Sequence, residues 1–224
     1  AAFASFIANK EKKDTANKFC NKPLEFLHFA NISSYLQNAN VFIKELAEEL
    51  HDVKTIWEPS KRATRKGFQT AKNINLFTNP SVKVAILKSI IAEELDLYYL
   101  KFQKKSCFYI KNWPTEKNLS AWHVILKHQG HQTAHIHPGG WLSGVIYLKV
   151  VSALGRDEGA IEFSLNGKNY SDDDSLKVVH QPTVGDIVFF PSSLHHRTIP
   201  FTTDTDRIVV SFDLMPESAI QQFG

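Results

Sequence analysis

The stretch HIHPGGWLSGVIYL, residues 135–148, decides the fold. It begins with a His-x-His pair, passes through a Pro-Gly-Gly turn and ends in a run rich in Leu, Val, Ile and Tyr, which is typical of a β-strand. Side chains two positions apart in a strand point to the same side. His135 and His137 are therefore expected to face together, as are Ser143 and Tyr147.

Short strands of this kind continue through the second half of the chain. Apolar stretches rich in Val, Ile, Phe and Tyr alternate there with clusters of Gly, Pro, Asn and Asp. This spacing predicts an antiparallel sandwich or barrel. The expected strands are residues 107–111, 120–127, 141–151, 160–164, 176–179, 186–190 and 207–214.

The first third of the chain has a helical pattern. Apolar residues recur at helical spacing over residues 35–50, and a second helix is signalled by Asn79-Pro80 and runs towards Tyr98. The polar, basic stretch between them, residues 59–75, is predicted to be a loop. We expect a mostly helical N-terminal region, residues 1–105, packed on a β core, residues 106–224, in one continuous domain.

Composition limits the class of protein. The chain has 224 residues, is 43% apolar and carries a net charge of +3, which suits one sizeable core. Scattered Lys and Arg residues argue against nucleic-acid binding. Apolar runs fall short of the ~18–20 residues that span a bilayer, so no membrane association is expected. Cys20 and Cys107 form no CxxC motif and favour reduced thiols in the cytoplasm.

A second group of polar residues follows the predicted strand at 186–190. His196 comes just beyond this strand, and Arg207 follows His196 by 11 positions. A strand from Arg207 places Ser211 on the same face. An arginine that enters a sheet core is costly unless it meets an anion, and its fork matches a carboxylate. The alternative is an ion pair within the protein, for example with Asp186.

The order of these motifs resembles the 2-oxoglutarate/Fe(II) oxygenases. Over residues 119–216 it is similar to a bacterial branch with H-x-H-P, W-L-S-G-V-x-Y-L and F-P-S…H-R-T-x-P, which also occurs at the C-terminus of tetratricopeptide-repeat proteins. The resemblance implies a mainly β fold with flanking helices, the double-stranded β-helix or jelly roll. It also implies Fe(II), 2-oxoglutarate as cosubstrate, dioxygen, and a small-molecule or peptide substrate. A tetratricopeptide-repeat segment in a longer parent chain would explain the missing initial Met.

The resemblance assigns roles to individual residues. His135 and His196 would bind iron, and Arg207 would bind the distal carboxylate of 2-oxoglutarate, with Ser211 and Tyr147 as hydroxyl donors. The expected reaction couples substrate oxidation, of the hydroxylase type, to decarboxylation of 2-oxoglutarate to succinate.

This sequence departs from the family at the third metal ligand. The family usually has Asp or Glu two residues after the first histidine, completing a face of two histidines and one carboxylate, whereas this chain has His137. Either three imidazoles hold the iron, or His137 turns away and water or another residue takes its place. We favour three imidazoles, with His131 as the first alternative ligand.

Two other classes of protein remain open. A cupin-type metalloenzyme or metal-binding protein without 2-oxoglutarate shares the jelly roll and the His-x-His pair. It normally has a Glu shortly after that pair, and none lies between His137 and Val151. A non-catalytic module with a structural zinc site would need four ligands, often cysteines. Cys20 and Cys107 are poorly placed in the sequence for such a site.

Overall fold

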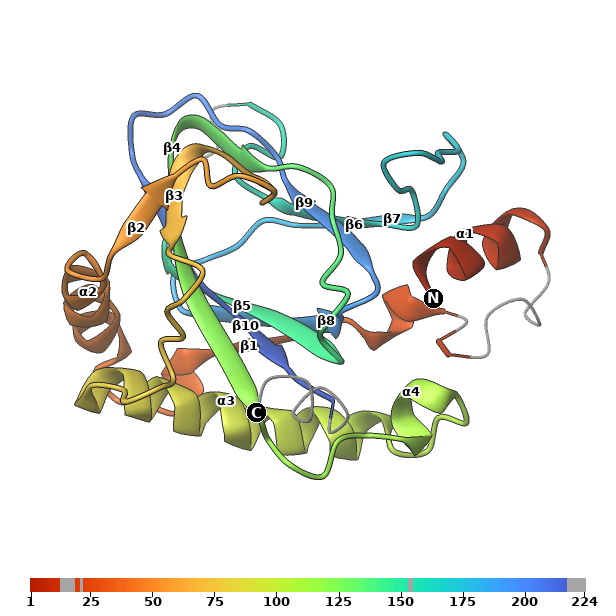
Figure 1. Ribbon diagram of the computed structural model, residues 1–224, viewed down its shortest axis with the longest axis horizontal. Helices are drawn as coiled ribbons and strands as arrows, with labels where there is room; N and C mark the ends of the chain where they lie inside the picture. Colours follow the sequence, from red (N-terminus) through yellow and green to blue (C-terminus); the bar gives the residue numbers. More distant parts are fainter. Residues whose placement is uncertain (13–18, 21, 153–154, 217–224) are drawn as a thin grey trace.

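Two antiparallel sheets form the centre of the molecule in a computed structural model that describes residues 1–12, 19–20, 22–152 and 155–216 (Figure 1). The larger sheet has the strand order β1-β8-β5-β10-β4-β3-β2, and the smaller has the order β7-β6-β9. The strands are β1 (His28–Asn31), β2 (Thr55–Trp57), β3 (Thr64–Thr70), β4 (Leu119–Gln132), β5 (Leu142–Lys149), β6 (Ile161–Ser164), β7 (Lys177–His180), β8 (Asp186–Pro191), β9 (His195–Thr198) and β10 (Arg207–Leu214).

The chain alternates between these sheets after β5. It enters the small sheet for β6 and β7, returns to the large sheet for β8, crosses again for β9 and comes back for β10. The two sheets lie as facing layers in Figure 1. This is a double-stranded β-helix, so the predicted jelly roll with flanking helices is confirmed.

Strand β10 shows how the alternation of side chains divides the core. Ile208, Val210 and Phe212 point out of the roll and pack in one apolar cluster with residues of the helices. Arg207 and Val209 point between the two sheets, where Val209 belongs to a second apolar cluster. The polar members of the inward face are therefore held inside the roll by a strand whose other face is fixed by apolar burial.

Helices cover the outer face of the large sheet. Helix α2 (Ala39–Leu50) and helix α3 (Val82–Phe102) contribute Ile43 and Tyr98, among others, to the outer cluster. The Ser81 hydroxyl caps α3 by accepting a hydrogen bond from the backbone N–H of Val84 at 3.2 Å. The described helical elements are completed by α1 (Ala2–Lys10), α4 (Phe108–Lys111), η2 (Pro23–Phe26) and η3 (Ile32–Ser34). None of the helices described here is both long and apolar enough to span a membrane.

Several predicted elements were wrong or displaced. Residues 107–111, predicted as a strand, form helix α4, because a helical turn buries both Tyr109 and Ile110 in the outer cluster. Residues 59–75, predicted as a loop, contain β3, which pairs with β2 on one side and β4 on the other. Its sequence TRKGFQT lacks an apolar run, so only the pairing identifies it as a strand. Strands β1, β2 and β9 were also not predicted.

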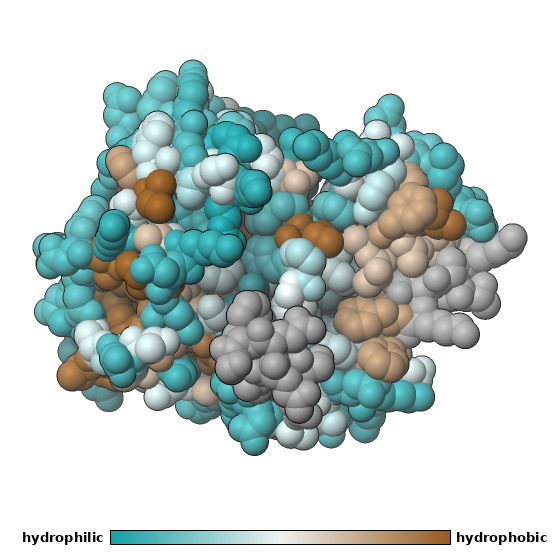
Figure 2. Space-filling view, in the orientation of Figure 1, coloured by the Kyte–Doolittle hydropathy of each residue, from teal (hydrophilic) through white to brown (hydrophobic). Residues whose placement is uncertain are grey.

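The structure also shifts the helix limits. Helix α2 begins at Ala39 rather than near Tyr35, since η3 and a turn precede it. Helix α3 begins after Ser81, not after Asn79, and continues beyond Tyr98 to Phe102. Seen in the orientation of Figure 1, the surface is largely hydrophilic, with apolar side chains scattered in small groups (Figure 2).

Candidate metal and cosubstrate site

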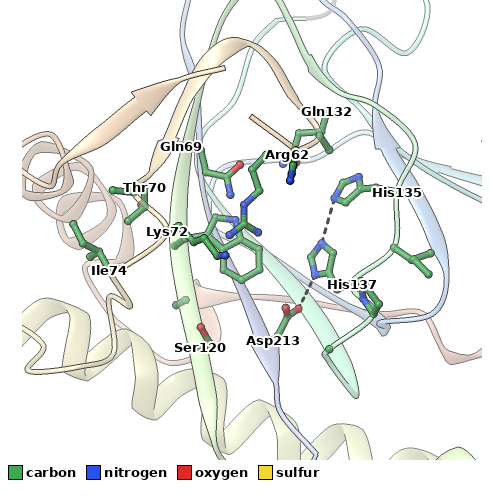
Figure 3. Close-up of a pocket in the computed structure, with 18 of the residues that line it drawn as sticks. Arg62, Gln69, Thr70, Lys72, Ile74, Ser120, Gln132, His135, His137 and Asp213 are labelled. Atoms are coloured by element: carbon green, nitrogen blue, oxygen red, sulfur yellow. Dashed lines mark hydrogen bonds and ion pairs between the residues drawn. The ribbon is translucent and has the colours of Figure 1, made fainter. Parts of the chain in front are cut away.

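A pocket of about 470 Å³ opens at one end of the jelly roll, next to the His-x-His pair (Figure 3). One side of it is formed by His135 and His137, and the opposite side by β3 and the loops that flank it. Asp213 and Trp122, from the inner faces of β10 and β4, lie between these sides. The pocket therefore connects solvent with the space between the sheets.

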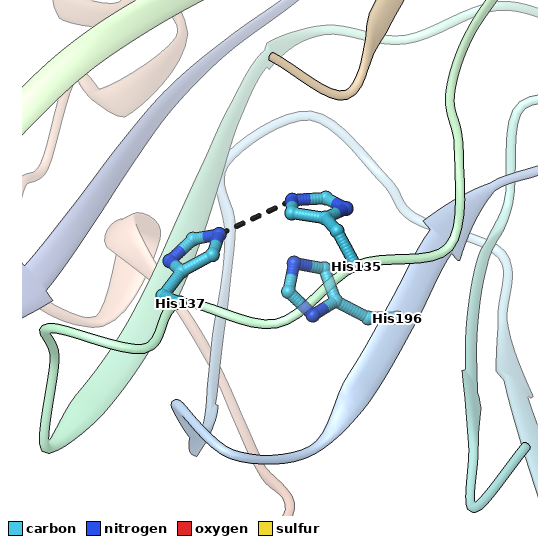
Figure 4. A group of neighbouring side chains, drawn as sticks. All are labelled: His135, His137 and His196. Atoms are coloured by element: carbon cyan, nitrogen blue, oxygen red, sulfur yellow. Dashed lines mark hydrogen bonds between the residues drawn. The ribbon is translucent and has the colours of Figure 1, made fainter. Parts of the chain in front are cut away.

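Three imidazoles converge at the inner end of this pocket (Figure 4). His135 and His137 come from the segment between β4 and β5, and His196 comes from β9. One potential ligand atom from each ring lies within 4.8 Å of the other two. Two backbone hydrogen bonds of 3.1 Å join His135 to His196, so the two segments are fixed side by side.

Hydrogen bonds donated by the Nδ1 atoms fix the orientation of the three rings. Nδ1 of His135 lies 2.7 Å from the Thr133 carbonyl oxygen, and Nδ1 of His196 lies 3.1 Å from that of Leu194. Carbonyl oxygens only accept, so Nδ1 of each ring carries the proton and Nε2 keeps its lone pair. The backbone thus sets the tautomer that a metal ion requires.

His137 is held in the same way, but by a side chain. Its Nδ1 lies 2.6 Å from Oδ1 of Asp213, which also accepts a 2.6 Å hydrogen bond from Ser143. Its Nε2 lies 3.2 Å from Nε2 of His135. Two nitrogens each about 2.1 Å from one ion, at right angles, would lie about 3 Å apart. The pair is therefore spaced as two neighbouring ligands of a single ion would be.

Electrostatics also favours neutral rings at this position. Burial, reinforced by the neighbouring imidazoles, lowers the pKa of His135 to about 4 and that of His196 well below its ordinary value. Both rings therefore remain unprotonated at neutral pH and can offer lone pairs. The donor set of three imidazoles suits a first-row transition metal such as iron.

Other residues considered from the sequence lie differently. His131 is partly exposed, its Nδ1 lies 3.1 Å from the Gln129 carbonyl oxygen, and it is not part of the convergent group among the described residues. Asp213 had no predicted role. A signal was present, because the inward alternation from Arg207 through Ser211 reaches Asp213 next.

Arg207 lies deep in the space between the sheets. It is only 2% exposed, its Nε donates to the Gly159 carbonyl at 3.1 Å, and its guanidinium carbon lies 4.9 Å from the centre of the Tyr147 ring. In the described part of the chain, no carboxylate pairs with it. Asp186, the predicted alternative partner, instead accepts hydrogen bonds from Asn31 and Thr183.

A buried cation without a counter-ion indicates an anion site. Burial lowers the pKa of Arg207 and raises that of Tyr147 to about 12. The Tyr147 hydroxyl is buried and has no hydrogen-bond partner among the described residues. Arg207, Ser211, His137 and His196 line one narrow cavity, which also includes Trp122. The buried guanidinium and two of the three imidazoles thus line the same space, as a metal-bound carboxylate ligand would require.

The sequence and structure are similar to known oxygenases. Residues 120–213 match the family model described as "Putative 2OG-Fe(II) oxygenase". No curated protein is detectably similar to the chain.

Solved structures share the fold at low sequence identity. A prolyl-4-hydroxylase from Pseudomonas putida is 13% identical, with a TM-score of 0.58 over 85% of this chain and 92% of that one. A Trichoplax adhaerens prolyl hydroxylase, in complex with a hypoxia inducible factor peptide fragment, is 11% identical, with a TM-score of 0.61 over 92% and 89%. HygX from Streptomyces hygroscopicus, with nickel and 2-oxoglutarate bound, is 12% identical, with a TM-score of 0.52 over 85% and 83%. The likeness shows a shared fold, and the family match supports an Fe(II)- and 2-oxoglutarate-dependent oxygenase.

Proposed function

We propose that His135, His137 and His196 hold the Fe(II) of this 2-oxoglutarate-dependent oxygenase, and that Arg207 binds the distal carboxylate of the cosubstrate. The observation that carries the proposal is the buried guanidinium of Arg207, which has no acidic partner among the described residues and lines the same cavity as two of the imidazoles. A structural arginine would be expected to have a carboxylate within the protein.

The side chains of the chain would divide the work of binding. Arg207 would form a bidentate pair with a carboxylate, and the hydroxyls of Tyr147 and Ser211 would donate to it. Asp213 would keep the Nδ1 proton on His137 and so direct its Nε2 towards the ion. The apolar residues between the sheets would keep water away from the bound groups. When bound, iron, 2-oxoglutarate and dioxygen supply the oxidising chemistry, with succinate and carbon dioxide as coproducts.

The finer properties of the enzyme belong to this proposal as well. We expect a hydroxylase-type reaction. The 470 Å³ pocket beside His135 and His137 is open to solvent, so a small molecule or a peptide could enter it. A cytoplasmic location and a tetratricopeptide-repeat segment in a longer parent chain remain predictions from the sequence.

Anaerobic titration of 2-oxoglutarate into the Fe(II)-loaded protein tests the proposal. A weak visible charge-transfer band should appear, and Arg207→Ala should weaken cosubstrate binding by about 3–5 kcal/mol, as for the loss of one partner of a buried charge pair. Arg207→Lys, which keeps the charge but not the fork, should lose less. Arg156→Ala removes a 95% exposed arginine and serves as the matched control.

Metal binding by the same variants separates a local effect from misfolding. If Arg207→Ala binds Mn(II) like the wild type but binds 2-oxoglutarate equally well too, Arg207 is not the cosubstrate residue. A protein that binds metal with no band and no 2-oxoglutarate affinity would instead support the cupin-type alternative.

A further inference from the structure

The pocket wall opposite the imidazoles consists largely of hydrogen-bond donors. We call it the β3 wall and define it as residues 61–74, which comprise β3 and its flanking loops. Three cations of this wall line the pocket: Lys61, Arg62 and Lys72. Among the described residues, none of them pairs with a carboxylate. Asp213 is the acidic residue in the described lining, and it already accepts hydrogen bonds from His137 and Ser143.

A backbone hydrogen bond holds the segment next to Arg62 close to the proposed metal site. The carbonyl of Ala63 accepts a 3.0 Å hydrogen bond from the N–H of Thr133, whose own carbonyl contacts Nδ1 of His135. Arg62 is the neighbour of Ala63. In Figure 3 its side chain extends across the pocket near Gln69 and Lys72, with the two histidines on the opposite side. The charged wall and the imidazoles are therefore two sides of one space.

A buried amide adds a fixed donor to this wall. Gln69 is 5% exposed, and its Oε1 accepts a 2.8 Å hydrogen bond from the Thr64 hydroxyl. That hydroxyl in turn accepts from Nε2 of Gln132 at 3.5 Å, so its proton is free to donate to Gln69. The amide orientation follows from this chain of bonds. Nε2 of Gln69 makes no hydrogen bond within the described residues, and because Gln69 lines the pocket, this N–H group can donate to a bound ligand.

We propose that the β3 wall binds the anionic group of the substrate, and that the substrate is a small molecule with a carboxylate or phosphate group. Arg62, Lys72 and the Gln69 amide supply donors to its oxygens. The Trp122 ring lies 5.5 Å from the His137 ring and offers an apolar surface between the wall and the metal site. The apolar part of the substrate would pack there, which brings its C–H bonds towards the imidazoles.

This inference rests on the proposed function, yet it concerns a part of the chain that the family match does not reach. The β3 wall precedes residue 120, where that match begins. The oxygenase motifs would supply the chemistry, and the wall would supply the charge preference of this protein.

Paired probes that differ only in charge test the proposal. Phenyl phosphate is compared with phenol, and hippurate with its amide, by calorimetry on the Mn(II) protein with saturating 2-oxoglutarate. Each anion should bind at least tenfold more tightly than its neutral partner. Arg62→Gln and Lys72→Gln should each reduce anion binding, and the double variant should abolish most of the preference. Lys44→Gln, an exposed lysine on α2, should change nothing.

The possible outcomes test the anion site and the cosubstrate site separately. Equal binding of charged and neutral probes, or full anion affinity in the Arg62/Lys72 double variant, would overturn the anion site. Tighter binding of an acidic peptide than of any small anion would overturn the small-molecule class. Loss of 2-oxoglutarate binding is measured separately and reports on the proposed function. Anion preference that persists without 2-oxoglutarate binding would leave the β3 wall supported and the cosubstrate assignment refuted.

Discussion

The two sides of the pocket are built on different physical principles. On one side Arg207 and His196 are buried, His135 and His137 are partly buried, and each histidine ring has its Nδ1 fixed by a carbonyl or carboxylate. On the other side the cations of the β3 wall are exposed and have no described ionic partners. The first arrangement suits a fixed metal and cosubstrate, which need preorganised ligands. The second suits a substrate that must enter and leave, because exposed charges attract ligands at little cost in stability.

The largest expected effect is a loss of metal affinity on substitution of His196, compared with its neighbour in the chain, His195. His196→Ala removes one of the three imidazoles and should reduce Mn(II) affinity by more than about a hundredfold, since an ion held by three side chains loses one ligand. His195→Ala alters the neighbouring ring, which packs against Tyr170 outside the trio, and should bind metal normally. Electron paramagnetic resonance of free Mn(II) measures both. Equal affinities in the two variants would show that the trio is not the metal site.

A smaller loss is expected for the group that orients His137. Asp213→Asn should weaken metal affinity by about 10–100-fold, the usual effect of removing a carboxylate behind a histidine ligand. Asp206→Asn, on the surface next to Lys127, is the control. If Asp213→Asn binds metal as tightly as the wild type, His137 is not held for coordination by this bond, and the case for a third imidazole ligand weakens.

A substitution in β3 should lower the stability of the fold without changing its affinity for metal. A Cβ at Gly67 would lie 2.6 Å from the Ile125 carbonyl oxygen and 2.8 Å from a methyl of Leu126, so Gly67→Ala should cost about 1–3 kcal/mol of unfolding free energy. Gly139→Ala meets only the tip of Met215, at 3.9 Å, and should be tolerated. Urea unfolding measures the cost, and Mn(II) titration should show unchanged affinity in both variants.

The contrast between apolar and polar strands explains which elements the sequence could predict. Strands such as β5 and β10 have apolar residues facing the helices, so their pattern identifies them without any partner. Strands β3 and β9 have polar sequences, TRKGFQT and HHRT, and depend on their neighbours for recognition. Helix α4 was misread because Phe108, Tyr109 and Ile110 favour strands locally, while burial against the rest of the fold selects a helical turn.

The site shows a similar limit. The order of His135, His137, His196 and Arg207 predicts a cluster because strand periodicity carries each side chain inward. The bond between His137 and Asp213 joins residues 76 positions apart, so no local pattern reveals it. Gln69 and Arg62 could not be assigned, because they belong to a segment predicted as a loop.

The coupling between β3 and the core gives a final, smaller prediction, which depends on pH. His123 on β4 is buried, and its Nδ1 lies 2.8 Å from the Thr70 hydroxyl of β3. Burial, with a minor contribution from His51, lowers its pKa to about 4. The unfolded chain, with an ordinary histidine pKa of about 6.5, then binds more protons than the folded chain between pH 6.5 and 4.

Stability should therefore fall as the pH is lowered through this window. By linkage the loss from His123 is about 2 kcal/mol between pH 8 and pH 5. His123→Gln should flatten the pH dependence of the unfolding free energy by that amount, and His128→Gln, at an exposed position near Asp204, is the matched histidine control. An unaltered slope in His123→Gln would mean that protonation of this ring does not oppose folding. The hydrogen bond between His123 and β3 would then not make the stability of the fold depend on pH.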